Sequence, residues 1–351
     1  MSKTRKIELT QSIVSCLILL FVFVDKAESQ DLHFSQFFHS PLSTNPANTG
    51  FIPTSDYRVG AHYREQWASI PVPYKTMSIF GDFQFMRDRF RSGWMGLGGM
   101  ILQDVAGTGK LRSTKAYASV AYHQMLGSTG LLSAGFNVGY AGKQINQDKL
   151  TFDNQWNGRF FDSNVPSGEI FQNNSIGYFD LQAGLNYAYF PSDNVYLHAG
   201  FSVHHLNKPK ESFFAVSPGY DNTIQPRSIF FTDAVIKLNN KIILSPGIYY
   251  ASQAKSSELT AGMHLNYNVA NEGDQQLILG VYFRQNDAYI PMVGYQWRNF
   301  KFSFSYDVTS SPLKYFNNSR GATEMFMQYD GLYSTMYGAG RQSMCPTFKS
   351  F

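Results

Sequence analysis

Several residue types that could do chemistry are present, but their spacing matches no enzyme motif. Residues 105–110 end in Gly-Thr-Gly-Lys, which is similar to a phosphate-binding loop. The similarity fails because Asp104 stands where the motif needs glycine, and Leu111 stands where it needs serine or threonine. The sequence also contains no Gly-x-Ser-x-Gly nucleophile elbow. No hydrolase or nucleotide-binding motif therefore supports an enzyme.

Two histidines could bind a metal only if the chain brought them together. His198 and His204 are an even number of residues apart, so in a strand they share one face and His205 takes the other. Six residues of strand span about 20 Å, too far for one metal ion. We interpret these histidines as polar residues of an inner wall or an interface, and we expect no metal site.

Charged residues in the same pattern predict a polar inner face. Its predicted carboxylates are Asp180, Asp233, Asp307 and Glu324. The candidate cations opposite them are Arg58, Arg64, Arg227 and Lys301. For any single pair, the alternative is a solvated, charged pore wall, which membrane barrels commonly have.

The elements that must position these residues are strands. Apolar and small or polar residues alternate with period 2 through residues 132–140, 179–189, 259–267 and 300–308. Fourteen such segments begin near residues 57, 75, 94, 112, 131, 176, 195, 227, 242, 257, 276, 288, 300 and 322. The segments near Arg227 and Ala322 alternate poorly. Segments of about ten residues with one apolar face are typical of membrane-barrel strands.

The connections between these segments favour the same architecture. With both termini periplasmic, the three longest connections, 144–175, 207–226 and 309–321, all fall on the external side. Tyrosine and tryptophan near strand ends are typical of aromatic girdles. The candidates are Trp67, Trp94, Tyr196, Tyr249, Tyr250, Trp297 and Tyr315. The alternative is a soluble β-sandwich whose core these aromatic residues fill.

Composition excludes several other classes. Only 15% of residues are charged, the net charge is +4, and two of the 351 residues are cysteine. These values argue against disorder, a disulfide-stapled fold, a four-cysteine zinc module and nucleic-acid binding. No stretch after the N-terminus has 18 consecutive apolar residues, so a membrane-spanning chain must close its strands into a barrel.

Residues 1–29 are predicted to be a cleaved secretory signal peptide. A basic start precedes an apolar core, Ile13 to Val24, and Ala27-Glu28-Ser29 gives a cleavage site before Gln30. The alternative is a helical membrane anchor, for which the core is short. Residues 57–330 are the expected barrel and residues 331–351 a periplasmic tail.

The segment 30–56 differs from the rest because it is apolar without alternation. Pro41, Asn45-Pro46 and Pro53 break any long element. Such an apolar segment would expose several aromatic residues if it were free, so we expect it at the periplasmic mouth as a plug or rim. The alternative is a disordered leader.

Several blocks outside this general pattern resemble one known family. They are Gln30–Phe37, Asn45-Pro46-Ala47-Asn48-Thr49-Gly50, Tyr63-Arg64-Glu65-Gln66-Trp67, Ser305-Tyr306-Asp307 and Cys345-Pro346-Thr347-Phe348. Together they resemble the PorP/SprF outer-membrane proteins of Bacteroidetes. The structural or partner-facing positions implied by this resemblance are Asn45, Pro46, Tyr63, Arg64, Gln66, Trp67, Cys345 and Pro346. Thr347 departs from the arginine usual in the family ending.

The resemblance implies a role in type IX secretion and the linked gliding or adhesion machinery. Its members are expected to be outer-membrane barrels that hold a secreted adhesin or other cargo through its C-terminal sorting domain. The implied partners are that cargo, other type IX components and outer-membrane lipid. No nucleic acid, enzyme activity or cofactor is implied. The alternative function is a porin or small-molecule transporter.

Overall fold

The computed structural model describes most of the chain between residues 31 and 333. Within that range it leaves out residues 54, 69–71, 87–91, 163, 170, 172, 215–220 and 271–273. The predicted signal peptide, together with Cys345 and Pro346, lies outside the described residues.

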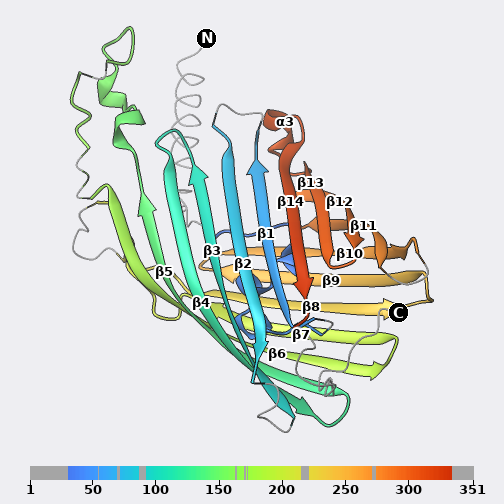
Figure 1. The fold of residues 1–351 in the computed structure, drawn as a ribbon. Coiled ribbons are helices and arrows are strands. Elements are labelled where there is room, and N and C mark those ends of the chain that lie inside the picture. The colour runs from blue at the N-terminus through green and yellow to red at the C-terminus, as the bar shows by residue number, and fades with distance from the viewer. Residues whose placement is uncertain are drawn as a thin grey trace, which may run out of the picture. The chain divides into compact units, whose positions relative to one another are not determined.

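Fourteen antiparallel strands form one closed barrel in which β1 pairs with β14 (Figure 1). The strands are β1 (Tyr57–Gln66), β2 (Tyr74–Phe85), β3 (Gly93–Ala106), β4 (Leu111–Leu126), β5 (Gly130–Gln144), β6 (Ser175–Ser192), β7 (Val195–His204), β8 (Arg227–Lys237), β9 (Ile242–Gln253), β10 (Ser256–Asn268), β11 (Gln275–Arg284), β12 (Ala288–Trp297), β13 (Phe300–Thr309) and β14 (Arg320–Gly331). The predicted barrel is confirmed, including the two weakly alternating segments, which form β8 and β14.

The alternation along each strand separates an apolar exterior from a polar interior. In β5, Leu132, Phe136 and Tyr140 are 37–54% exposed on the outside, whereas Ser133 and Asn137 are fully buried inside. A closed wall whose outer face is apolar is stable in lipid, so the soluble sandwich is wrong. None of the described helices is long and apolar enough to cross a bilayer.

The prediction that certain tyrosine and tryptophan residues form an outward-facing aromatic girdle is confirmed for only some of them. Tyr250 and Trp297 are 42% and 54% exposed on the outer face, but Trp94, Tyr196 and Tyr249 are buried inside the barrel. The physical reason is strand parity, since a shift of one position moves a side chain to the other face.

The three longest connections lie at one end of the barrel, as expected. They are residues 145–174, with η3 (Gln147–Lys149) and η4 (Asp153–Gln155), residues 205–226, and residues 310–319, with α3 (Lys314–Asn317). We call this the loop end. The opposite end, where β1 begins and β14 finishes, is the terminal end.

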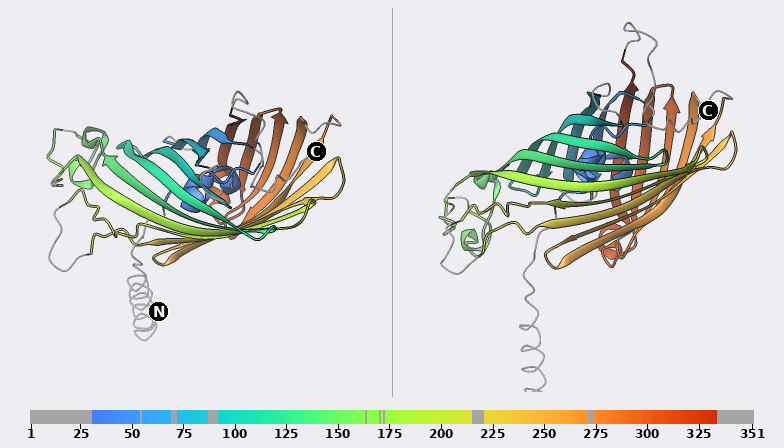
Figure 2. Two further views of the ribbon diagram at one scale, coloured as in Figure 1. Left: turned by 60° about the horizontal axis from the view of Figure 1, so that its bottom comes forward. Right: turned by 90° about the horizontal axis from the view of Figure 1, so that it is seen from below.

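Residues 31–53, the lumen segment, lie inside the ring of strands (Figure 2). The segment contains η1 (Phe37–His39), α2 (Pro41–Thr44) and η2 (Pro46–Asn48). Pro41 and Pro46 each stand at the start of a short helix, where their missing N–H costs no hydrogen bond. The Asn45 side chain caps η2 by accepting a hydrogen bond of 2.8 Å from the Ala47 N–H.

The buried apolar core lies between this segment and the wall. Phe37 packs with Phe231 and Tyr249 on one side, and Phe34 and Leu42 pack with a second cluster on the opposite strands. A third cluster surrounds Phe51 and includes Trp94, Leu131 and Tyr196. Burial of a large apolar side chain stabilises by roughly 1.5–3 kcal/mol, so these contacts hold the segment in place.

Candidate functional site

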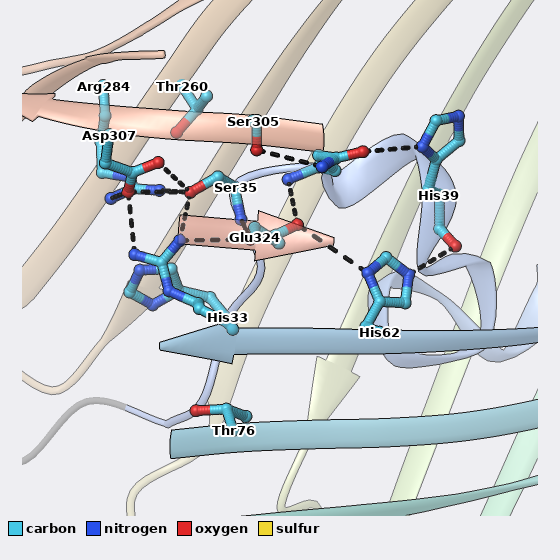
Figure 3. Close-up of polar contacts among 12 residues, drawn as sticks. His33, Ser35, His39, His62, Thr76, Thr260, Arg284, Ser305, Asp307 and Glu324 are labelled. Atoms are coloured by element: carbon cyan, nitrogen blue, oxygen red, sulfur yellow. Dashed lines mark hydrogen bonds and ion pairs between the residues drawn. The ribbon is translucent and has the colours of Figure 1, made fainter. Parts of the chain in front are cut away.

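Four charged side chains of the wall meet around Ser35 of the lumen segment (Figure 3). The Arg64 guanidinium donates to Asp307 at 2.8 Å and to Glu324 at 3.1 Å. Arg284 donates to the same Asp307 oxygen at 3.1 Å. The Ser35 N–H donates to Glu324 at 2.8 Å and its hydroxyl donates to Asp307 at 2.9 Å. We call Arg64, Arg284, Asp307 and Glu324 the clamp.

The strand register brings the clamp together at the seam where the barrel closes. Arg64 on β1 lies directly opposite Glu324 on β14, and β13, which carries Asp307, is the other neighbour of β14. All four clamp side chains are at most 4% exposed. Two arginines and two carboxylates balance in charge, so each buried ion keeps a partner.

A third carboxylate continues this network toward the segment's N-terminal end. Glu258 on β10 lies 3.3 Å from Arg284 and 3.3 Å from the imidazole of His33. The lumen segment is therefore tied to β1, β10, β11, β13 and β14 by charged groups.

The backbone carbonyls of the lumen segment accept hydrogen bonds from wall side chains. Short helices leave their own carbonyls unsatisfied, and a buried carbonyl needs a partner. The pairs are Arg227 to Leu32, His62 to His39, Asn137 to Leu42, Ser202 to Thr44, Asn186 to Ala47, Arg58 to Asn48, His123 to Thr49, Trp94 to Gly50 and Gln84 to Ile52. The donors come from the eight strands β1 to β8, so more than half of the wall contributes a hydrogen bond to this segment.

The segment runs from the loop end to the terminal end. Asp31 pairs with Lys115 and with His205. Both partners lie at the loop end, because β4 begins there at Leu111 and β7 ends there at His204. Gly50 lies at the terminal end, where its N–H donates to Asp82 at 2.6 Å. The sequence predicted that this segment lies at the periplasmic mouth. Residues near Gly50 lie at the terminal end, and the rest of the segment extends through the lumen to Asp31 at the loop end.

Inward-facing glycines make room for the turn at Asn45 and Pro46. A Cβ on Gly135 would lie 2.4 Å from the Pro46 carbonyl, and one on Gly184 would lie 1.9 Å from the Asn45 amide oxygen. The Asn45 amide nitrogen donates to the backbone oxygens of Leu185 and Phe201 on β6 and β7, at 3.0 and 3.3 Å. Glycine in the wall thus permits close approach of another backbone.

His205 corrects the prediction that it faces away from the interior. Strand β7 ends at His204, and His205 has a φ of 57°, which ends the alternation and turns the ring inward. Its two nitrogens lie 2.8 Å from Asp180 and 3.3 Å from Asp31. His198 and His204 are buried on the inner face, as predicted. Among the described residues, no three potential ligands gather in a metal-binding group.

Of the predicted cations, only Arg64 pairs with predicted carboxylates. Arg58 pairs with Asp82 at 2.7 Å, and Asp233 pairs with His198 at 3.1 Å. Arg227 donates to the Tyr249 hydroxyl and to a backbone carbonyl. The sequence pattern missed Ser35, Asp82, Glu258 and Arg284, because long-range register decides which inward residues meet.

The remaining motif residues lie on both faces of the wall. Tyr63 faces outward beside the inward Arg64, and Gln66 ends β1. Trp67 follows with a φ of 56°, and its ring contacts Tyr74 edge to face at 5.3 Å. Among these eight positions, the described ones with polar contacts between the lumen segment and the wall are Asn45, which donates to β6 and β7, and Arg64, which donates to the Ser35 hydroxyl.

Acid is expected to loosen the lumen segment. Burial lowers the pKa of His33 to about 4, outweighing the attraction of Glu258, and burial also holds the pKa of His39 well below its ordinary 6.5. A released segment would bind these protons near pH 6.5, so docking is strongest above that value and weakens as the pH falls toward 4. Hydrogen exchange of residues 31–53 should speed up between pH 7.5 and 4.5 after correction for intrinsic rates. An unchanged corrected rate would contradict this.

Exposed aromatic residues gather on the connections of the loop end. Trp156, Phe160 and Phe161 are 50–55% exposed on the β5–β6 connection. That connection contacts the β7–β8 connection through the rings of Phe171 and Phe214, whose centroids are 4.7 Å apart. We call Trp156, Phe160, Phe161 and Phe214 the loop-end aromatic surface.

Comparison with known proteins gives one family and one fold. The family model for type IX secretion system membrane protein PorP/SprF matches residues 26–329. No curated protein matches the chain. Two solved structures of a monoaromatic hydrocarbon channel, TodX, are similar at 10% identity: a deltaS2 mutant (TM-score 0.53, 84% of this chain, 94% of that one) and a deltaS2S3 mutant (TM-score 0.52, 83% and 94%). At this identity the likeness concerns the barrel fold alone.

Proposed function

Since the chain belongs to the PorP/SprF family of type IX secretion system membrane proteins, we propose that it binds a secreted adhesin through the adhesin's C-terminal sorting domain. The protein is an outer-membrane β-barrel, and in this proposal it holds its cargo at the cell surface. Other components of the same secretion system are expected partners. The family is one of secretion membrane proteins, which points away from an enzyme.

The loop-end aromatic surface is the observation that best supports this proposal. Large aromatic side chains exposed to water are costly unless a partner covers them. Aromatic residues also contribute most of the binding energy in many protein interfaces. The surface lies on the side predicted to be external, where a secreted protein arrives.

The clamped lumen segment favours docking over conduction. Its aromatic side chains and short helices occupy the space inside the ring of strands. A porin keeps a polar, water-filled channel in that space. The barrel is therefore better suited to present its loops than to pass solutes.

The test is to purify the protein from native outer membranes and identify what accompanies it. A secreted protein with a sorting domain is expected with the wild type. The triple variant Trp156→Ser, Phe160→Ser and Phe161→Ser should recover it roughly tenfold less, since losing one strong aromatic contact costs about 1.4 kcal/mol or more.

A matched control removes exposed apolar residues from the other end of the barrel. Leu238 and Val269 are 60% and 58% exposed on terminal-end connections, so Leu238→Ser with Val269→Ser should leave recovery unchanged. Heat-modified migration on gels checks that each barrel is folded. Recovery of no secreted protein with the folded wild type would contradict the proposed function.

A further inference from the structure

A cavity of about 350 Å³ lies between the lumen segment and the wall. Phe37, Phe38 and Pro53 line it from the segment, and residues of β1, β7 to β11 and β13 line it from the wall. Its wall residues include Tyr196 and Lys301, which stand near the start of strands at the terminal end. The cavity therefore belongs to the opposite end from the loop-end aromatic surface, and the proposed function does not use it.

Flat aromatic rings form one part of the cavity. Phe38 stacks on Tyr282 at 5.0 Å and on His264 at 4.9 Å between ring centroids. Phe37 meets Tyr282 edge to face at 5.9 Å, and Phe231 lines the same space. Such surfaces favour a flat apolar group, which gains from stacking or edge contacts.

A lysine in the cavity has no partner among the described residues. Lys301 faces inward on β13, and its cross-strand neighbours are the uncharged Gln296 and Gln328. Two histidines, His39 and His264, lie near it, and a second cation of the same cavity, Arg58, is already paired with Asp82 at 2.7 Å. A partly buried ammonium without a counter-ion is unfavourable, so the cavity attracts an anion.

The opposite part of the lining offers a second polar group. Among the described residues that line the cavity, Asp233 is the only carboxylate, and it lies 3.1 Å from Nδ1 of His198. The other ring nitrogen of His198 is buried and has no hydrogen-bond partner in the structure. An isolated buried nitrogen of this kind is expected to find a partner in a ligand or water.

From these contacts we propose that the cavity binds an aromatic carboxylate. The ring of the ligand packs against Phe38, Phe231 and Tyr282, and its carboxylate pairs with Lys301. Two sources share this chemistry: a free aromatic acid and the C-terminal aromatic residue of a peptide. A cavity of this size lies within the usual range for small-molecule sites.

Binding is tested on the full-length protein in detergent with 3-phenylpropionate as probe, by isothermal titration. The neutral 3-phenylpropanamide should bind roughly tenfold more weakly, since a hydrogen bond between two charged groups is stronger than one to a neutral amide. Lys301→Met should lose that preference and Lys301→Arg should keep it. Lys255→Met, on the β9–β10 turn, is the matched control and should bind like the wild type.

A second variant is designed to fill the cavity while Lys301 is left unchanged. Gly247 lines the cavity, and a Cβ there would meet the Phe37 ring at 3.4 Å, an ordinary contact, so the larger side chain of Gly247→Leu is expected to occupy this space. It should abolish binding of the probe while the barrel keeps its heat-modified migration. Binding that survives in both Lys301→Met and Gly247→Leu would overturn the proposal, as would equal binding of the acid and the amide.

A comparison with peptides distinguishes a free aromatic acid from the C-terminal aromatic residue of a peptide. A hexapeptide ending in a phenylalanine carboxylate is compared with the same peptide as its C-terminal amide and with 3-phenylpropionate. Tighter binding of the peptide acid identifies a chain end as the ligand, and weaker binding identifies a free acid. Failure of every acid to bind at millimolar concentration would reject the site without bearing on the capture of a secreted protein.

Discussion

Replacing Arg64 by methionine should lower the free energy of unfolding of the barrel by about 3–5 kcal/mol. Arg64 is 3% exposed and is hydrogen-bonded to both Asp307 and Glu324, so its loss leaves two buried carboxylates with less compensating charge. Ser35 and the rest of the lumen segment are held by these same carboxylates. Urea titration of the barrel in lipid vesicles, followed by tryptophan fluorescence, measures the change.

A surface arginine of β14 provides the control for this effect. Arg320 is exposed, and Arg320→Met should change the unfolding free energy by no more than about 0.5 kcal/mol. Combining Arg64→Met with Glu324→Gln should restore part of the loss, because one unpaired charge is removed with its partner. Equal stability of Arg64→Met and Arg320→Met would show that the clamp does not hold the barrel.

Deleting residues 34–48 should open the lumen. The deletion removes η1, α2 and η2 together with Phe34, Phe37 and Leu42, which pack against the wall. Single-channel conductance in planar bilayers should rise by on the order of tenfold, since a barrel of this size encloses a polar interior. The wild type should show few or no steps.

A point variant makes the same test without shortening the chain. Gly135→Val places a side chain against the Pro46 carbonyl, where even a Cβ would be only 2.4 Å away, and should displace the segment. Gly142→Val on the same strand is the control, because a Cβ there has no neighbour closer than 3.9 Å. A deletion that leaves conductance unchanged would mean that the lumen segment does not block passage. A wild type that already conducts would favour the porin alternative.

The molecule joins a hydrogen-bonded, buried interior to a loop end that exposes aromatic side chains. Charged and polar groups hold the lumen segment to strands around the ring, while the large connections carry exposed aromatic residues. This division suits a protein that presents a binding surface from a fixed base. It also separates the predictions, since clamp variants test the interior and loop variants test partner capture.

The sequence alone determined the barrel because alternation is a local property. The direction of the side chains repeats every two residues along a strand. The apolar face of Leu132, Phe136 and Tyr140 can therefore be predicted without knowing which strands lie beside it. The same rule placed Arg64, Asp307 and Glu324 on the inner face. It failed at His205, where the strand ends and a positive φ turns the ring inward.

Only the tertiary structure decided which inward residues meet and what fills the barrel. Arg64 is 260 residues from Glu324, and Asn186 is 139 residues from the Ala47 carbonyl it binds. Pairings at such separations depend on strand register and on closure between β1 and β14. The path of the lumen segment depends likewise on donors spread over many strands, because a segment without alternation carries no local sign of its partners.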